Sequence, residues 1–395
     1  MGHSAAPQGA HAGTAADTWV IDRNQLGELL SAIAASGHQV IGPRIEGGAI
    51  VYGPVQTVDE LPSGYLDEQD GGQYRLQKAQ AIDGADRALF RYTVGPHSWK
   101  RYLFPPRQLL WQARRTDPGS FVIEPPATEP PRYAFVGVRA CELAAIRVQD
   151  RVFDNGDYTD SAYQARRSAA LIVAVNCTRA GATCFCTSMG TGPAVGEGAD
   201  LTLTELLDAD SHRFLVQAGS DKGSEILAKL SLTPADAADI ERARGLVAQA
   251  ATSMGRQMPE NASEILSRNP EHPRWLHVAE RCLSCANCTL VCPTCFCSTV
   301  EDQTSLDGST AERHRRWDSC FSMDFSYIHG GAVRRETASR YRQWITHKLS
   351  HWHEQFGTSG CTGCGRCITW CPVGIDITEE VAAIKASELT ETGEP

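Results

Sequence analysis

Apolar residues recur at helical spacing near the start of the chain. Between Asp22 and Ser36 the leucines and the isoleucine fall on one helical face, and Gly37 follows as a terminator. Residues 39–56 then contain two β-rich apolar runs on either side of a Gly-Gly pair. This pattern predicts an amphipathic helix followed by a β-hairpin.

Two apolar runs in the middle of the chain have the composition of buried strands. These are residues 133–138 (YAFVGV) and 170–175 (ALIVAV), and the segment ELAAIRVQDRVF between them has helical character. The order strand, helix, strand predicts a parallel pair buried on both faces. A further strand-like run at 212–219 and a helical run from Pro234 to Ala251 extend this α/β pattern.

Prolines interrupt the pattern in two places. They occur in SWKRYLFPPRQLLW at 98–111 and in EPPATEPPRY at 124–133. Because proline lacks a backbone donor and breaks periodicity, we expect these passages to be loops between short elements.

Helical periodicity returns in the last third of the chain. In RYRQWITHKLSHWHEQF, residues 340–356, the aromatic and aliphatic side chains form one stripe that also contains Lys348. Another helix is expected to start at Thr378, with Glu379 and Glu380 in its first turn, where the helix dipole favours acidic groups. This part of the chain is therefore expected to be mainly helical.

The composition indicates a globular protein in a reducing compartment. The length of 395 residues suits two or three domains, and the first residues lack the features of a signal peptide. Fifteen cysteines in such a chain favour cofactors over disulfides. The net charge of −10 argues against non-specific nucleic-acid binding, and no apolar run approaches a membrane span. We expect a cytoplasmic redox protein that binds neither nucleic acid nor a membrane.

Eight of the cysteines form two runs with the same spacing. Each run reads C-x2-C-x2-C-x3-C-P, which is typical of bacterial-type ferredoxins. The first run consists of Cys282, Cys285, Cys288 and Cys292, and the second of Cys361, Cys364, Cys367 and Cys371. In such proteins three thiolates of a run hold one cluster, and the fourth ligates the other cluster.

We therefore expect two [4Fe–4S] clusters that are ligated across the runs. One would take Cys282, Cys285, Cys288 and Cys371, and the other Cys361, Cys364, Cys367 and Cys292. The alternative is a pair of zinc knuckles. Zinc sites are usually built from separated pairs of ligands, and not from runs of four that end in proline.

The expected fold class is an α/β N-terminal domain plus a mainly α-helical two-cluster ferredoxin domain. We place the α/β domain at residues 18–265 and the ferredoxin domain at residues 266–395. Residues 1–17, rich in Ala and Gly, are expected to be a disordered tail.

Four more cysteines lie in the expected α/β domain. Cys141 follows the first of the two central strands and Cys177 follows the second, so both are expected at the carboxyl edge of the sheet. A glycine-containing loop then returns Cys184 and Cys186 towards them. These four thiolates would hold a third [4Fe–4S] cluster; a zinc site and plain buried thiols are the alternatives.

Cys295, Cys297 and Cys320 belong to none of these groups. Three thiolates are too few for a full cubane site. We expect them to pack beside the clusters and tune their potentials, and an extra metal is the alternative.

No motif for hydride, hydrogen or sulfite chemistry accompanies the cysteines. The chain has no G-x-G-x-x-G after a strand, no Walker loop, no pair of C-x2-C motifs near its two ends and no sirohaem pattern. We therefore expect single-electron transfer without catalytic residues, with the reactions themselves on other subunits.

Several longer segments are more distinctive than the runs alone. They are VGVRACELAA, NCTRAGATCFCTSMGTGP, CLSCANCTLVCPTCFCSTVED, WDSCFSMDF, SWKRYLFPP and RYRQWITHKLSHWHEQFGTSGCTGCGRC. Together they resemble the β subunit of cytosolic NAD(P)-linked [NiFe]-hydrogenases of the sulfhydrogenase type, and the related electron-transfer subunit of anaerobic sulfite reductase. The resemblance runs from about residue 85 to residue 385.

The resemblance implies an iron–sulfur electron-transfer subunit of a soluble multisubunit [NiFe]-hydrogenase. Its implied partners are a flavin- and NAD(P)-binding subunit, a small iron–sulfur subunit and a [NiFe] catalytic subunit. The first alternative is the electron-transfer subunit of anaerobic sulfite reductase, whose partners would be the other sulfite reductase subunits. The second is a scaffold subunit in which the clusters only stabilise the fold.

Overall fold

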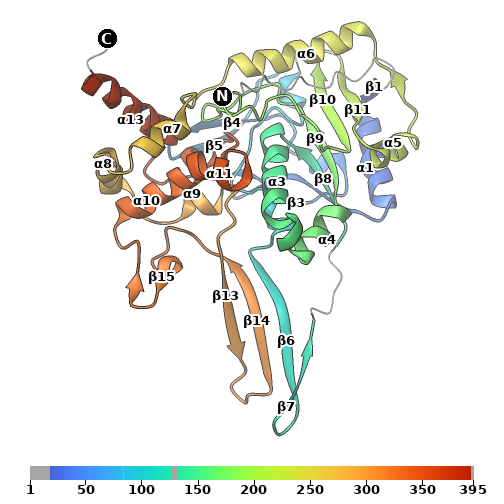
Figure 1. Ribbon diagram of the computed structural model, residues 1–395. Helices are drawn as coiled ribbons and strands as arrows, with labels where there is room; N and C mark the ends of the chain where they lie inside the picture. Colours follow the sequence, from blue (N-terminus) through green and yellow to red (C-terminus); the bar gives the residue numbers. More distant parts are fainter. Residues whose placement is uncertain (1–17, 83, 126–130, 393–395) are drawn as a thin grey trace.

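A mixed sheet of eight strands organises the first part of the protein (Figure 1). The computed structural model describes residues 18–82, 84–125 and 131–392, so the tail expected at 1–17 lies outside the described residues. In spatial order the strands are β12 (Thr233–Pro234), β1 (Thr18–Asp22), β11 (His212–Ala218), β10 (Leu201–Leu207), β9 (Leu171–Val175), β8 (Tyr133–Val138), β2 (Gln39–Glu46) and β3 (Ala49–Pro54).

The central strands of this sheet are parallel and buried on both faces. β8 pairs in parallel with β9 and with β2, and β9 pairs in parallel with β10. Val136 and its partner Val173 pack with helix α1 (Arg23–Ala35) on one face. Phe135 and Ile172 pack with helix α3 (Ala140–Phe153) on the other face. The expected parallel pair and its crossover helix are confirmed.

Short helices and hairpins complete this region. The helices are α2 (Lys100–Leu103), α4 (Ser161–Ala169), α5 (Asp221–Leu227) and α6 (Ala237–Thr252). Short 3-10 turns lie at η2 (Val58–Glu60), η3 (Ala85–Arg87) and η4 (Gly156–Tyr158), and β4 (Tyr65–Asp70) pairs with β5 (Gln73–Lys78). The hairpin expected at 39–56 is β2–β3, and Gly47 and Gly48 adopt the positive φ that its turn requires.

The C-terminal region is mainly helical. Its helices are α7 (Ala262–Arg268), α8 (Arg274–Arg281), α9 (Asn287–Leu290), α10 (Thr337–Thr346), α11 (Trp352–Phe356), α12 (Arg366–Thr369) and α13 (Ile377–Thr392). A π-helical turn, His347–His351, joins α10 to α11, so the helix expected at 340–356 is locally widened. A 3-10 turn, η5 (Asp324–Ser326), and a small hairpin of β15 (Tyr327–Ile328) and β16 (Gly331–Ala332) precede α10. The expected fold class is confirmed.

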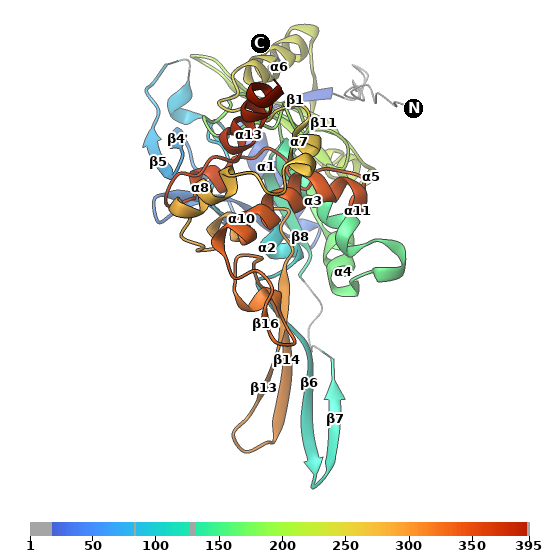
Figure 2. The same cartoon turned by 60° about the vertical axis from the view of Figure 1, so that its left-hand side comes forward.

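A four-stranded arm projects from the body (Figures 1 and 2). Its strands, in spatial order, are β13 (Ser298–Thr304), β14 (Thr310–Trp317), β6 (Arg107–Asp117) and β7 (Ser120–Glu124). Pro105 and Pro106 lie between α2 and β6, as expected of a loop between elements, but β6 is an eleven-residue strand and not a short element. The second proline-rich passage falls partly at 126–130, outside the described residues.

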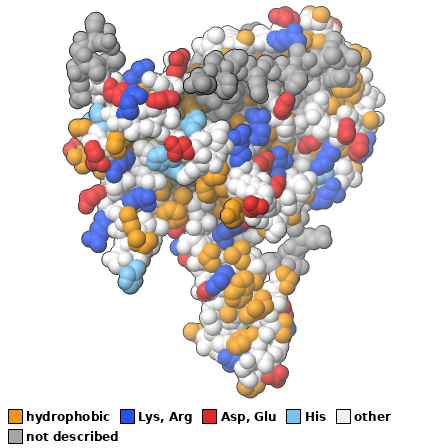
Figure 3. All heavy atoms as spheres, in the orientation of Figure 1, with side chains coloured by type: hydrophobic (Ala, Val, Ile, Leu, Met, Phe, Trp, Pro, Cys, Tyr) orange, Lys and Arg blue, Asp and Glu red, His pale blue; other side chains and the backbone are white. Residues whose placement is uncertain are grey.

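Hydrophobic side chains gather on the surface of this arm (Figure 3). The large exposed ones include Phe121, Val122 and Ile123 of β7, Val300 of β13 and Leu306 at the tip of the β13–β14 hairpin. An apolar surface of this kind is typical of an interaction site.

A buried ion pair joins the helical region to the sheet. Arg366, at the start of α12, is fully buried and pairs with Glu142 in the first turn of α3. Its guanidinium also donates to the carbonyls of Gly95 and His97, both at 2.8 Å. The carboxylate of Glu142 also accepts hydrogen bonds from the hydroxyl of Tyr52 at 2.7 Å and from the indole N–H of Trp99 at 3.1 Å. Breaking this pair would leave a charge in the interior without its partner.

We predict that Arg366→Met lowers the free energy of unfolding by about 3–5 kcal/mol, because Glu142 would remain buried and unpaired. Urea unfolding of anaerobically prepared protein measures this loss. The control is Arg313→Met, which removes an exposed ion pair with Asp302 on the arm and should change stability far less. Equal losses in the two variants would show that the buried pair does not hold the regions together.

Candidate metal centres

The two cysteine runs have the same backbone conformation. In each run the residues two and four positions after the first cysteine have positive φ: Ser284 (51°) and Ala286 (65°) in the first, Gly363 (63°) and Gly365 (76°) in the second. Glycine adopts this conformation freely, whereas Ser and Ala lose about 1–2 kcal/mol in it. The first run therefore keeps a strained loop, which is the behaviour of a functional site.

Backbone N–H groups of both loops point at cysteine sulfur atoms. The N–H of Ser284 donates to Sγ of Cys282 at 3.4 Å, and the N–H of Gly363 donates to Sγ of Cys361 at 3.5 Å. Each loop then enters a single helical turn, α9 or α12, that contains the third cysteine of its run. Such N–H groups stabilise negative charge on sulfur, as thiolate ligands require.

The fourth cysteine of each run lies with the other run. Cys371 interacts with Cys282 and Cys288, and all three line one hollow together with Cys285. Cys292 lies near Cys361 and Cys367 in the same way. The structure thus brings together the thiols that ligation across the runs requires, and the pairing itself stays a prediction.

Apolar side chains enclose the hollow of the first group. Phe321, Tyr341 and Trp344 line it on the side of α10, and Val373 and Ile375 line it after the second run. Such a lining excludes water and lowers the local dielectric, which tunes the potential of a cluster.

The four N-terminal thiols meet at the carboxyl edge of the sheet. Cys141 lies in the first turn of α3, and Cys177 follows β9 by two residues. Cys141 and Cys177 both interact with Cys186, and Cys186 interacts with Cys184. A fifth thiol, which sequence reasoning missed, lies with them. Cys364 of the second run packs against Cys141 and Cys186 in one buried cluster. The N-terminal thiols therefore border the second-run group directly, where the second-run group means Cys361, Cys364, Cys367 and Cys292.

A buried guanidinium accompanies the N-terminal thiols. The guanidinium of Arg139 lies near the thiol of Cys177 and donates to the carbonyls of Phe90 and Tyr92, both at 2.7 Å. Its fixed positive charge offsets part of the negative charge that a thiolate-ligated cluster brings into the interior.

Burial alone favours the protonated thiols, so a bound metal ion would be needed to hold them as thiolates. Burial raises the pKa of Cys184 and of Cys361 to about 12, because the thiolate would lose its hydration. Among the described residues, no group of three or more His, Cys, Asp or Glu side chains is already arranged as a site for a metal ion. Bound iron would supply the missing positive charge and deprotonate the coordinating thiols.

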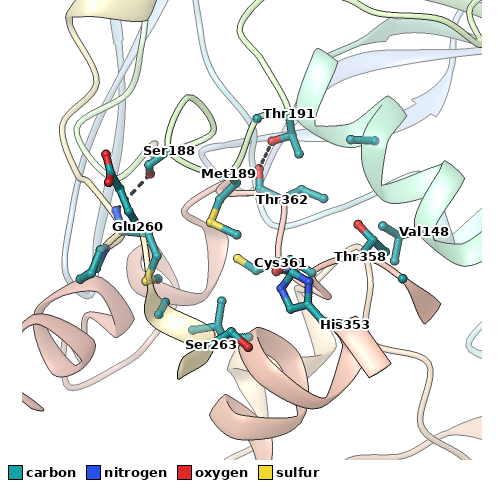
Figure 4. A pocket seen from close by; sticks show the side chains of 18 of the residues that line it. Val148, Ser188, Met189, Thr191, Glu260, Ser263, His353, Thr358, Cys361 and Thr362 are labelled. Atoms are coloured by element: carbon teal, nitrogen blue, oxygen red, sulfur yellow. Dashed lines mark hydrogen bonds between the residues drawn. The ribbon is translucent and has the colours of Figure 1, made fainter. Parts of the chain in front are cut away.

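A cavity of about 800 Å³ borders the second run (Figure 4). Cys361 lines it together with Met189 and His353. Its wall is held by a 2.7 Å hydrogen bond from the hydroxyl of Thr191 to the carbonyl of Thr362. The cavity places open space next to one thiol of the second-run group.

We predict that Cys371→Ser removes the paramagnetic signal that Cys285→Ser removes, because both thiols belong to one expected cluster. Cys292→Ser should remove the signal that is lost in Cys367→Ser. Electron paramagnetic resonance of the reduced full-length variants makes this comparison. Ligation within the runs would instead make Cys371→Ser match Cys367→Ser.

We also predict that Gly363→Ala destabilises the protein more than Gly190→Ala does. Both glycines have nearly the same φ, +63° and +65°. A Cβ at Gly363 would lie 2.6 Å from backbone atoms of Phe185 and Cys186, whereas nothing lies within 4 Å of one at Gly190. The left-handed conformation should destabilise each variant by about 1–2 kcal/mol, and overpacking should add about 1–3 kcal/mol at Gly363 alone. Equal free energies of unfolding would contradict this packing.

Comparison with known proteins supports the iron–sulfur interpretation. Residues 281–375 match the family described as 4Fe-4S dicluster domain. The chain is also 29% identical over 330 residues to sulfhydrogenase 2 subunit beta of Pyrococcus furiosus, which covers 82% of this chain and 89% of the relative. No solved structure matches the chain.

The match to the relative extends well beyond the ferredoxin runs. Among the described residues, no helix is long and apolar enough to cross a membrane. The resemblance to the sulfhydrogenase β subunit is thus confirmed: the chain is a homologue of that subunit, and its C-terminal region contains a 4Fe-4S dicluster domain.

Proposed function

We propose that this chain relays electrons within a multisubunit [NiFe]-hydrogenase, between the catalytic module and a flavin/NAD(P) module. The proposal rests on one observation: the three groups of thiols adjoin one another in series. The N-terminal group meets the second-run group at Cys364, and Cys367 of the second-run group lies near Cys288 of the first-run group. Three clusters held in this order would let single electrons cross the chain in short steps.

The first-run end of this series reaches the surface. Cys285 is exposed, and Leu283 and Val373, which line the same hollow, are exposed apolar residues. An apolar rim around an accessible cluster suits the docking of another electron carrier. The exposed apolar surface of the arm supports a second contact with a neighbouring subunit.

The proposed partners follow from the relative. Its name identifies it as a β subunit of a sulfhydrogenase, which supports an assembly of several chains here as well. We infer that the partners are a flavin- and NAD(P)-binding subunit, a small iron–sulfur subunit and a [NiFe] catalytic subunit, and that the assembly works in the cytoplasm.

The residues of this chain hold, insulate and charge-balance the clusters. We infer that the eight ferredoxin-type thiolates hold two [4Fe–4S] clusters and that Cys141, Cys177, Cys184 and Cys186 hold a third. The bound clusters supply one-electron chemistry. Aromatic side chains around the first group exclude water, and the buried guanidinium of Arg139 lowers the electrostatic cost of a reduced centre near Cys177.

The test compares two activities of the purified complex. Cys285→Ser should reduce H2-dependent reduction of NAD(P)+ to below about a tenth of the wild-type rate, equivalent to ~1.4 kcal/mol in the barrier. Reduction of an artificial dye directly at the catalytic subunit should persist, which serves as the internal control.

Two outcomes would overturn the proposal. Full NAD(P)+ reduction after loss of the first-run cluster would leave this chain the role of a scaffold. Co-purification with a sulfite-reducing enzyme and no hydrogenase activity would assign it to sulfite reduction.

A further inference from the structure

The three remaining cysteines lie together at the base of the arm. Cys297 directly precedes β13, and Cys320 follows β14 by three residues. The N–H of Asp318 donates to the carbonyl of Cys297 at 2.9 Å, which closes the base of the β13–β14 hairpin. Both ends of this hairpin therefore present a thiol on the side of the body, where Figures 1 and 2 show the hairpin joining the helical region.

These thiols are close neighbours. Cys297 lies near both Cys320 and Cys295, close enough for each thiol to shift the pKa of the other. Cys295 lies near Cys292 in the same way, and Cys292 belongs to the expected second-run cluster. The group thus consists of three thiols of its own beside an expected cluster.

Two buried lysines face this group. Lys348 and Lys100 are each only 4% exposed. The ammonium of Lys348, in the π-helical turn, donates to Sγ of Cys292 at 3.3 Å and to the hydroxyl of Thr294 at 2.8 Å. The ammonium of Lys100 donates to the carbonyl of Cys295 at 3.0 Å and lies 3.9 Å from the centre of the Trp317 ring.

The burial of two ammonium groups requires nearby negative charge. Removing such an ion from water costs several kcal/mol unless a counter-charge compensates. Burial lowers the pKa of Lys100, and negative charge on the sulfur atoms of Cys295, Cys292 and Cys297 would oppose that shift. Lys348 is acted on by Cys292, Cys295 and Cys361. Neutral thiols or a disulfide would give no such compensation, whereas metal-bound thiolates are permanently charged.

We propose that Cys295, Cys297 and Cys320 hold a further iron–sulfur cluster at the base of the arm, in the field of Lys100 and Lys348. The other twelve cysteines belong to the three groups described above, so this cluster has three thiolates of its own. One of its iron positions is then left for a ligand other than cysteine. This replaces the expectation that the three thiols only pack beside the other clusters.

The position of this centre makes it a branch of the electron path. Cys295 borders Cys292 of the second-run group, and Cys320 lies near Cys288 of the first-run group. The centre therefore lies beside both expected ferredoxin clusters at the point where the arm leaves the body. It requires the clusters but does not depend on the identity of the partner subunits.

The first test is the metal content of the full-length, anaerobically prepared chain. Cys297→Ala and Cys320→Ala should each lose about three to four irons and a similar amount of acid-labile sulfide per chain. The signals that are lost in Cys285→Ser and Cys364→Ser should remain in both variants. Ser298→Ala, at the same base of the hairpin, is the matched control and should keep the full iron content.

The second test uses the charge of Lys100. Removing this positive charge in Lys100→Met disfavours the added electron, so one reduction potential in the chain should become more negative. Lys100→Arg keeps the charge and should restore that potential. If the cysteine variants lose all their clusters, the reduction potentials of Lys100→Met and Lys100→Arg still test the proposed cluster.

Full iron content in both cysteine variants would overturn the proposal, and so would zinc bound at this site. Unchanged potentials in Lys100→Met would overturn the charge argument. These results are independent of the hydrogenase assay, so the proposed relay and this centre can fail separately.

Discussion

The burial of Arg366 against Glu142 is the constraint on which the arrangement of the thiol groups depends. Arg366 lies between two cysteines of the second run, and Glu142 directly follows Cys141 of the N-terminal group. Tyr52 donates to Glu142, and two nearby carbonyl groups accept from Arg366. Because neither charge can be left alone in the interior, the second-run loop has one position on the sheet.

Buried positive charge lies beside several of the thiols. Arg139 faces Cys177, Lys348 faces Cys292, and Lys100 lies beside Cys295. Each charge would be unfavourable in an apolar core, and each becomes favourable when thiolate-ligated clusters bring negative charge with them. The interior therefore favours anionic cofactors. The same buried positive charges would also influence the reduction potentials of the clusters.

Local patterns in the sequence predicted much of this structure, and contacts between distant segments were not predictable. Spacing and periodicity gave the two runs, the β2–β3 hairpin and the parallel strands, because each depends on neighbouring residues. The pairing of β6 with β14 and the contact of Cys364 with the N-terminal thiols join segments far apart in the chain. Lys348 was assigned to the apolar stripe of its helix, but its partners became visible only in the structure.

The central claim is that adjacent groups of thiols hold clusters close enough to exchange electrons. Electron paramagnetic resonance of the fully reduced wild-type chain at two microwave frequencies tests it directly. The proposed arrangement predicts signals split by coupling between neighbouring reduced clusters, with a splitting in field that does not change with frequency. A spectrum that is the plain sum of isolated, uncoupled clusters would contradict the proposed arrangement.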